Sequence, residues 1–66
     1  MEYTLNGAQS IGDGTTSVKS VLEDRGITSP LVIVEINGTV LSKDNYVEHM
    51  VSEGDNIEII QLMGGG

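Results

Sequence analysis

The C-terminal end of the sequence carries the residues best suited to chemistry. Three glycines, Gly64, Gly65 and Gly66, follow a segment rich in β-branched residues and run to the last position. A glycine segment has no side chains, so it can extend through a narrow tunnel and place the carboxylate of Gly66 inside another protein. A carboxylate is a poor electrophile, but once activated as an acyl-adenylate it can pass to a sulfur or nitrogen nucleophile. A flexible terminus or a cloning remnant has the same composition, so glycine content alone leaves these interpretations open.

The other motifs do not support independent catalysis. Gly7-x-x-x-x-Gly12 has the glycine spacing of a phosphate loop, but Asp13-Gly14 stands where Lys and Ser/Thr are required. His49 is the single histidine, and no G-x-S-x-G motif surrounds a serine. The absence of cysteine, together with a single histidine, disfavours a zinc site. We therefore expect no catalytic residues, no metal ligands and no bound cofactor.

Composition and charge restrict the class of protein and its partners. The chain has 66 residues, with ten acidic and three basic side chains and a formal net charge of −7. This length fits one small domain, and the charge disfavours binding to nucleic acids and to anionic membranes. The charge would steer the chain toward a basic partner, or it could serve only solubility. Without cysteines, a signal peptide or a long apolar segment, we expect a soluble cytoplasmic protein that is a monomer on its own.

Hydrophobic periodicity predicts the elements that must position the glycine tail. Apolar and polar residues alternate over residues 1–6, which indicates a strand. Asn6-Gly7 favours a tight hairpin turn, and a return strand over residues 8–11 is weakly indicated. Residues 15–17 offer hydroxyl groups for the N-cap of a helix over 18–25, and Gly26 is placed to end that helix.

The second half of the sequence predicts three further strands. The apolar run 31–36 is typical of a strand covered on both faces over part of its length, and Asn37-Gly38 returns the chain through 39–41. Residues 42–51 are ambiguous between a turn and a single helical turn, and 56–62 reads as the last strand. This order predicts an α+β protein with a β-grasp (ubiquitin-like) fold: a mixed sheet of about four to five strands and one main helix, in which the first and last strands are parallel neighbours. The expected organisation is a β-grasp domain over 1–62 and a flexible glycine tail over 63–66. A ferredoxin-like fold is disfavoured because it needs two substantial helices.

Several segments together resemble a known family. They are Leu5-Asn6-Gly7, the helix over 18–25, Val34-Glu35-Ile36-Asn37-Gly38, Gly54-Asp55-x-Ile57-Glu58-Ile59-Ile60 and Met63-Gly64-Gly65-Gly66. Their order and spacing resemble those of the ThiS family, the sulfur carrier proteins of thiamine biosynthesis. The resemblance spans the whole chain.

The resemblance implies a mechanism in which the chain is a protein co-substrate and not an enzyme. A ubiquitin-activating-type, ThiF-like adenylyltransferase would use ATP and Mg²⁺ to adenylate Gly66. A sulfur donor system would convert the adenylate to a thiocarboxylate, from which a ThiG-like thiazole synthase would take the sulfur for the thiazole ring. Gly64 and Gly65 would lengthen the tail and keep it narrow, while Leu62 and Met63 would be apolar docking contacts.

Alternatives with the same chemistry and with different chemistry stay open. The family pattern needs only a terminal Gly-Gly, so Gly64 is an additional glycine that makes the contact register of Leu62 and Met63 uncertain. The small subunit of molybdopterin synthase also carries a thiocarboxylate, but those chains are usually longer and richer in aromatic residues, whereas this sequence lacks Phe and has Pro30 as its single proline. Carriers for cysteine or tRNA thiolation are a further variant. A ubiquitin-like interaction module that is never activated would not need a free glycine terminus.

Overall fold

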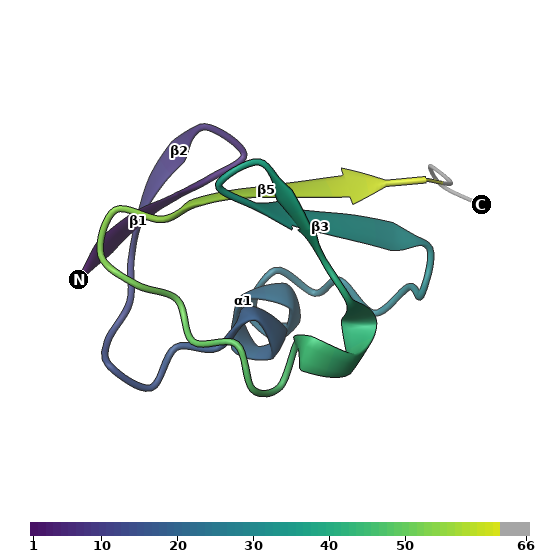
Figure 1. The fold of residues 1–66 in the computed structure, drawn as a ribbon, viewed down its shortest axis with the longest axis horizontal. Helices are drawn as coiled ribbons and strands as arrows, with labels where there is room; N and C mark the ends of the chain where they lie inside the picture. The colour runs from purple at the N-terminus through teal and green to yellow at the C-terminus, as the bar shows by residue number, and fades with distance from the viewer. Residues whose placement is uncertain (63–66) are drawn as a thin grey trace.

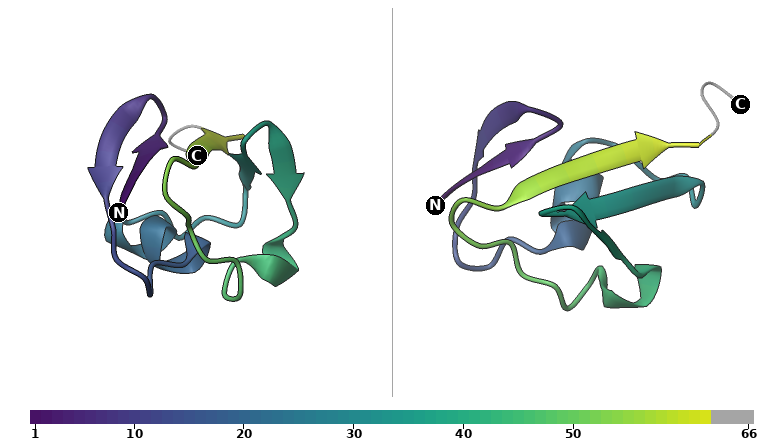
Figure 2. Two further views of the ribbon diagram at one scale, coloured as in Figure 1. Left: turned by 60° about the vertical axis from the view of Figure 1, so that its left-hand side comes forward. Right: turned by 45° about the horizontal axis from the view of Figure 1, so that its top comes forward.

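A computed structural model describes residues 1–62 of the chain (Figure 1). Within these residues the elements are β1 (Glu2–Leu5), β2 (Ala8–Ile11), α1 (Val18–Asp24), β3 (Val32–Ile36), β4 (Thr39–Leu41), the 3₁₀ turn η1 (Lys43–Asn45) and β5 (Asn56–Gln61). The five strands form one sheet in the order β2-β1-β5-β3-β4. β1 and β5 are parallel and the other neighbours are antiparallel. The helix lies against one face of this sheet (Figures 1 and 2). The predicted β-grasp fold, with its parallel first and last strands, is confirmed.

The core lies between the sheet and α1. Its buried side chains come from alternate positions of β1, β3 and β5 and from one stripe of the helix; they are Tyr3, Leu5, Val18, Val21, Leu22, Val32, Val34, Ile36, Val51, Ile57 and Ile59. The sequence predicts that residues 31–36 are covered on both faces over part of their length, and the structure buries one face while the other stays half-buried or exposed. Val34 is fully buried, but Ile33 and Glu35 on the opposite face are half-buried, and Leu31 is 48% exposed. One face of the sheet is therefore incompletely covered.

The helix begins and ends at the residues that the sequence indicated. The Oγ of Ser17 accepts a hydrogen bond from the backbone N–H of Ser20 (3.1 Å), and the Oγ of Ser20 accepts one from the N–H of Ser17 (2.9 Å). At the other end, the N–H of Gly26 donates to the carbonyl of Glu23 (3.0 Å) and that of Ile27 to the carbonyl of Leu22 (2.9 Å). This is the Schellman arrangement, which needs the positive φ of 70° that Gly26 adopts. The helix is one residue shorter than predicted, because position 25 is its C-cap.

Both predicted hairpin turns are present. Asn6 and Gly7 have φ of 50° and 83°, and Asn37 and Gly38 have φ of 52° and 86°. Positive φ at both central residues is the requirement of the type I′ turn, whose twist matches that of the flanking strands. The ambiguous segment after β4 contains η1, a single 3₁₀ turn.

The glycine spacing that resembles a phosphate loop has a steric explanation at Gly12. A Cβ added there would lie 2.6 Å from the Oγ1 of Thr16. That hydroxyl is fixed, because it accepts a hydrogen bond from the N–H of Asp13 (2.9 Å). Close packing of the loop before α1 therefore accounts for the glycine.

We predict that Thr15→Val raises the pKa of Asp13 toward its ordinary value. The Asp13 carboxylate accepts hydrogen bonds from the hydroxyl of Thr15 (2.6 Å) and from its backbone N–H (2.8 Å), and these bonds lower the pKa of Asp13. Because the pKa is lower in the folded than in the unfolded chain, the bonds stabilise the folded loop above the ordinary pKa. That contribution is lost as the pH falls through the lowered value. An NMR titration of the carboxyl carbon measures the change, and identical titration curves for parent and variant would contradict the assignment.

Candidate functional site

Strand β5 delivers the end of the chain from the centre of the sheet. It ends at Gln61, and the N–H of Leu62 still donates to the carbonyl of Leu31 (2.9 Å). The side chain of Leu62 is 54% exposed. The other residues that the sequence singled out, Met63, Gly64, Gly65 and Gly66, lie outside the described residues. Leu62 therefore lies at the exit from the sheet. The C-terminal end of β5 and the N-terminus are at opposite ends of the molecule (Figure 1 and Figure 2, right).

The asparagines of the two hairpin turns hold β5 in place from both sides. Asn6 donates its N–H to the carbonyl of Ile57 (2.8 Å), and its Oδ1 accepts from the N–H of Ile59 (2.7 Å). Asn37 donates its N–H to the carbonyl of Asn56 (2.8 Å), and its Oδ1 accepts from the N–H of Asn56 (2.9 Å). The strand that leads to the tail is therefore fixed by side chains as well as by its neighbouring strands.

Four aliphatic side chains gather beside the exit of the chain, on the face of the sheet away from α1. Ile33 lies opposite Ile60 in the β3–β5 register. Leu31 and Leu62 lie next to the last pair of that register, Val32 and Gln61, and are joined by a backbone hydrogen bond. Side chains two positions apart on a strand share a face, so all four point outward. Leu31, Ile60 and Leu62 are 48%, 44% and 54% exposed. We call these four residues the tail patch. Contiguous exposed apolar surface of this kind is typical of protein contact sites.

The sequence predicts one member of the tail patch and not the other three. It indicates Leu62 as a docking contact, whereas it assigns Leu31, Ile33 and Ile60 to strands without a role. The signal was present in the alternation of residues 31–36. It could be recognised only with the knowledge that the odd positions of this run face away from the helix.

Two carboxylates border the tail patch. Glu35 and Glu58 lie directly opposite one another in the β3–β5 register, and both side chains are half-buried. Like charges directly opposite one another in a sheet are unfavourable. A cationic side chain of a partner would relieve this repulsion. The outer face therefore offers an apolar surface with an adjoining site for positive charge.

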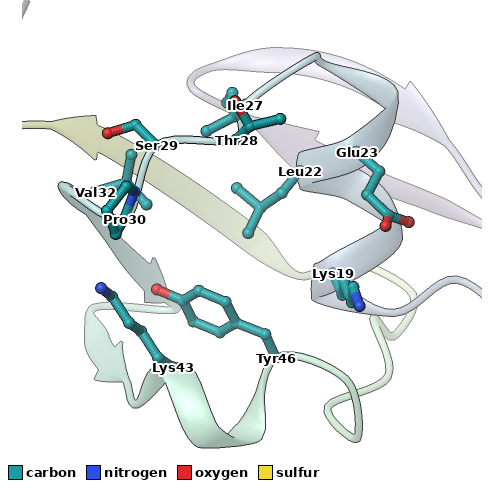
Figure 3. Close-up of a pocket in the computed structure, with 10 residues that line it drawn as sticks. All are labelled: Lys19, Leu22, Glu23, Ile27, Thr28, Ser29, Pro30, Val32, Lys43 and Tyr46. Carbon is teal, nitrogen blue, oxygen red and sulfur yellow. The ribbon is translucent and has the colours of Figure 1, made fainter.

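A groove lies on the other side of the sheet, between α1 and η1 (Figure 3). It has a volume of about 380 Å³ and is lined by Lys19, Leu22, Glu23, Ile27, Thr28, Ser29, Pro30, Val32, Lys43 and Tyr46. The ring of Tyr46 points into it, and burial raises the pKa of Tyr46 above its ordinary value. Leu62, the one predicted site residue within the described part of the chain, does not line this groove.

Within residues 1–62, His49 and the carboxylates form no cluster that could hold a metal ion. No group of three or more His, Cys, Asp or Glu side chains in this range is arranged to hold a metal ion. The backbone of His49 has a structural task, because its carbonyl accepts from the N–H of Val18 (3.0 Å) at the start of α1. In the same range, no helix has the length and apolar character to cross a membrane.

The chain is similar to proteins of thiamine biosynthesis. The family model described as the ThiS family matches residues 3–66. The sulfur carrier protein ThiS of Bacillus subtilis is 33% identical over 52 residues, 79% of either chain. A thiazole synthase of Paramagnetospirillum magneticum is 32% identical over 66 residues, which cover 100% of this chain but 20% of that protein. The crystal structure of the thiamine biosynthesis protein ThiS from Geobacter metallireducens superposes with a TM-score of 0.80, at 35% identity and with 100% of both chains covered. The match over nearly the whole length shows that the chain belongs to the ThiS family.

Proposed function

We propose that the chain is the sulfur carrier of thiamine biosynthesis and that the carboxylate of Gly66 is the group that carries the sulfur. The observation that supports this proposal is the position of Leu62, which follows β5 at the exit from the sheet and belongs to the exposed apolar tail patch. The membership of the family and the resemblance to the carrier of Bacillus subtilis support it.

The proposed chemistry has two transfers at Gly66. In the first, a carboxylate oxygen attacks the α-phosphorus of ATP, and pyrophosphate leaves with Mg²⁺ to balance its charge. In the second, a hydrosulfide equivalent from the sulfur donor system attacks the acyl carbon and displaces AMP, which leaves a thiocarboxylate. A ThiF-like adenylyltransferase supplies the ATP and Mg²⁺ sites, so this chain needs no cofactor of its own. Gly64 and Gly65 let the tail pass through a narrow channel because they add no side chains.

A ThiG-like thiazole synthase is the proposed acceptor of the sulfur. The thiazole synthase of Paramagnetospirillum magneticum contains a segment similar to the whole of this chain within a fivefold longer polypeptide. Joining a carrier to its acceptor in one polypeptide raises their effective concentration, and this is useful only for partners that must meet.

Reconstitution tests the proposed function directly. The chain is mixed with a ThiF-type activating enzyme, ATP, Mg²⁺ and a sulfur donor, and its intact mass is measured. We expect a gain equal to the difference between sulfur and oxygen, and no gain when ATP is omitted. Addition of the thiazole synthase with its substrates should return the mass to that of the carboxylate. An unchanged mass with an activating enzyme that is active on another carrier would contradict the proposal.

We predict that Ile60→Ser weakens binding to the activating enzyme roughly tenfold without destabilising the fold. Ile60 is 44% exposed and belongs to the tail patch, so a contact with the partner would bury the part of the side chain that folding leaves in water. Truncation of a central interface residue commonly costs more than about 1 kcal/mol, and about 1.4 kcal/mol is a factor of ten in affinity. Titration calorimetry measures the affinity. Ile11→Ser is the matched control, because Ile11 is 80% exposed at the edge of the sheet, away from the patch. Equal losses in both variants would argue against a specific role of the patch.

A further inference from the structure

The two sides of β5 are paired to different lengths. β3 accompanies β5 along its whole course, from Val32 opposite Gln61 to Ile36 opposite Ile57. β1 pairs with β5 only where Thr4 lies opposite Asn56 and Leu5 opposite Ile57. After Leu5 the chain turns away through Asn6-Gly7 into β2, on the far side of β1. The C-terminal half of β5 is therefore paired with β3 on one side, whereas its other side forms an open edge within the described residues.

Backbone alternation shows which groups face this open edge. The N–H of Ile59 points to the β1 side, where it donates to the Oδ1 of Asn6 (2.7 Å). The N–H of Leu62 points to the β3 side, where it donates to the carbonyl of Leu31 (2.9 Å). Because successive residues of a strand alternate in the direction of these groups, the carbonyl of Ile59 and both backbone groups of Gln61 face the β1 side. Within residues 1–62, no strand lies beside them there.

Asn6 sets the length of this edge. Its side-chain Oδ1 accepts the hydrogen bond from the N–H of Ile59 that the backbone of one further β1 residue would otherwise accept. Among residues 1–62, no strand pairs with the next three backbone groups along β5, directly before the chain leaves the sheet at Leu62. An edge with unpaired N–H and C=O groups is a template for another strand.

We propose that this open edge of β5 receives an extended backbone segment of the activating partner, which adds a strand beside residues 59–61. The proposal rests on the proposed function, since the partner is the enzyme that must bring the tail to its adenylation site. Strand addition supplies main-chain hydrogen bonds, and alternate side chains of the added strand supply specificity. Alternate side chains of a strand at this position lie on the outer face beside Ile60 and Leu62, so the edge and the tail patch form one continuous surface.

Charge favours a partner over a second copy of the chain. Two copies would each carry a formal net charge of −7, and their repulsion opposes pairing of the two edges. The two carboxylates that lie opposite one another on the same face, Glu35 and Glu58, favour a partner with basic side chains near its added strand.

A backbone substitution tests the proposal with little change elsewhere. A chain of 66 residues is accessible to chemical synthesis, so the amide between Ile60 and Gln61 can be replaced by an ester, which removes the N–H of Gln61 and keeps its side chain. We expect only a small decrease in unfolding temperature, because the Ile60 carbonyl that faces β3 remains as a weaker ester acceptor. Binding to the ThiF-type enzyme should be roughly five- to tenfold weaker, as expected for the loss of one hydrogen bond. The control is an ester that removes the N–H of Leu62. It should lower the unfolding temperature, because that group bonds to Leu31 within the chain.

Hydrogen exchange supplies a second readout. In the free chain we expect rapid exchange at the N–H of Gln61 and protection at Ile59 and Leu62, and in the complex we expect protection at Gln61 as well. Unchanged affinity of the Gln61 ester, or rapid exchange at Gln61 in the complex, would overturn the proposal while leaving the carrier function intact if the parent chain is still adenylated. A parent chain that is neither bound nor adenylated would overturn the proposed function itself. Protection at Gln61 that grows with concentration in the free chain, with dimers in light scattering, would assign the edge to a second copy and overturn the proposal.

Discussion

Deletion of Gly66 should abolish adenylation of the chain while its unfolding temperature stays nearly unchanged. The reaction requires the terminal carboxylate to reach the α-phosphorus of ATP, and removal of one residue withdraws it by about 3.3–3.6 Å in an extended chain. A misplacement of about 1 Å already costs on the order of a hundredfold in rate. Within residues 1–62, the last buried side chain is that of Ile59, so the core does not depend on the terminal glycine.

The measurement for this variant is ATP–pyrophosphate exchange catalysed by the activating enzyme, together with circular dichroism during heating. Asn6→Ala is an informative comparison, because it should lower the unfolding temperature through the loss of the bond to Ile59 and yet retain exchange below that temperature. Exchange at the parental rate after deletion of Gly66 would show that Gly66 itself is not required, since Gly64-Gly65 then forms the terminus.

The second large effect is expected for Gly65→Trp, which should block formation of the thiocarboxylate by roughly a hundredfold or more while the domain still folds. The carrier mechanism requires the tail to pass through a channel that fits a backbone without side chains. The indole ring of Trp is too large to enter such a channel. Docking through the tail patch is independent of that channel, so affinity for the activating enzyme should fall much less than transfer does. A ubiquitin-like interaction module, in contrast, would be indifferent to this substitution.

Intact mass after reconstitution measures the thiocarboxylate, and titration calorimetry measures docking. Val47→Trp is the matched control, because it adds the same ring at a side chain that is 63% exposed and lies outside the tail patch. We expect parental amounts of thiocarboxylate from the control. The same amounts from the Gly65 variant would argue against a threaded tail and for an interaction module.

Local signals in the sequence were sufficient to predict most of the fold. Ser17 and Gly26 mark the ends of α1 because each satisfies a specific need of a helix terminus, a side-chain acceptor at one end and a positive φ at the other. The Asn-Gly pairs mark both hairpins for an equally local reason. The weakly indicated strand over 8–11 is confirmed, since its pairing with β1 follows from the turn at Asn6-Gly7.

The candidate contact surface could not be predicted because it depends on contacts that are distant in sequence. The hydrogen bond between Asn6 and Ile59 joins residues 53 positions apart. Together with the turn at Asn6-Gly7, it marks the point on β5 where the pairing with β1 ends. The tail patch likewise requires the register that places Ile33 opposite Ile60. A continuous apolar run such as residues 31–36 does not reveal which of its faces a short helix will leave in water.

The central position of β5 also determines how the domain responds to force. A partner that draws the tail into a channel pulls on the end of β5 along the direction of the strand. The ladder to β3, the pairing with β1 and the side-chain bonds of Asn6 and Asn37 all lie across that direction, so they are loaded in shear and share the tension. A strand at the edge of the sheet would instead peel away one bond at a time. The same arrangement that presents the tail therefore acts as a mechanical anchor, which lets the tail be pulled taut without unravelling the domain behind it.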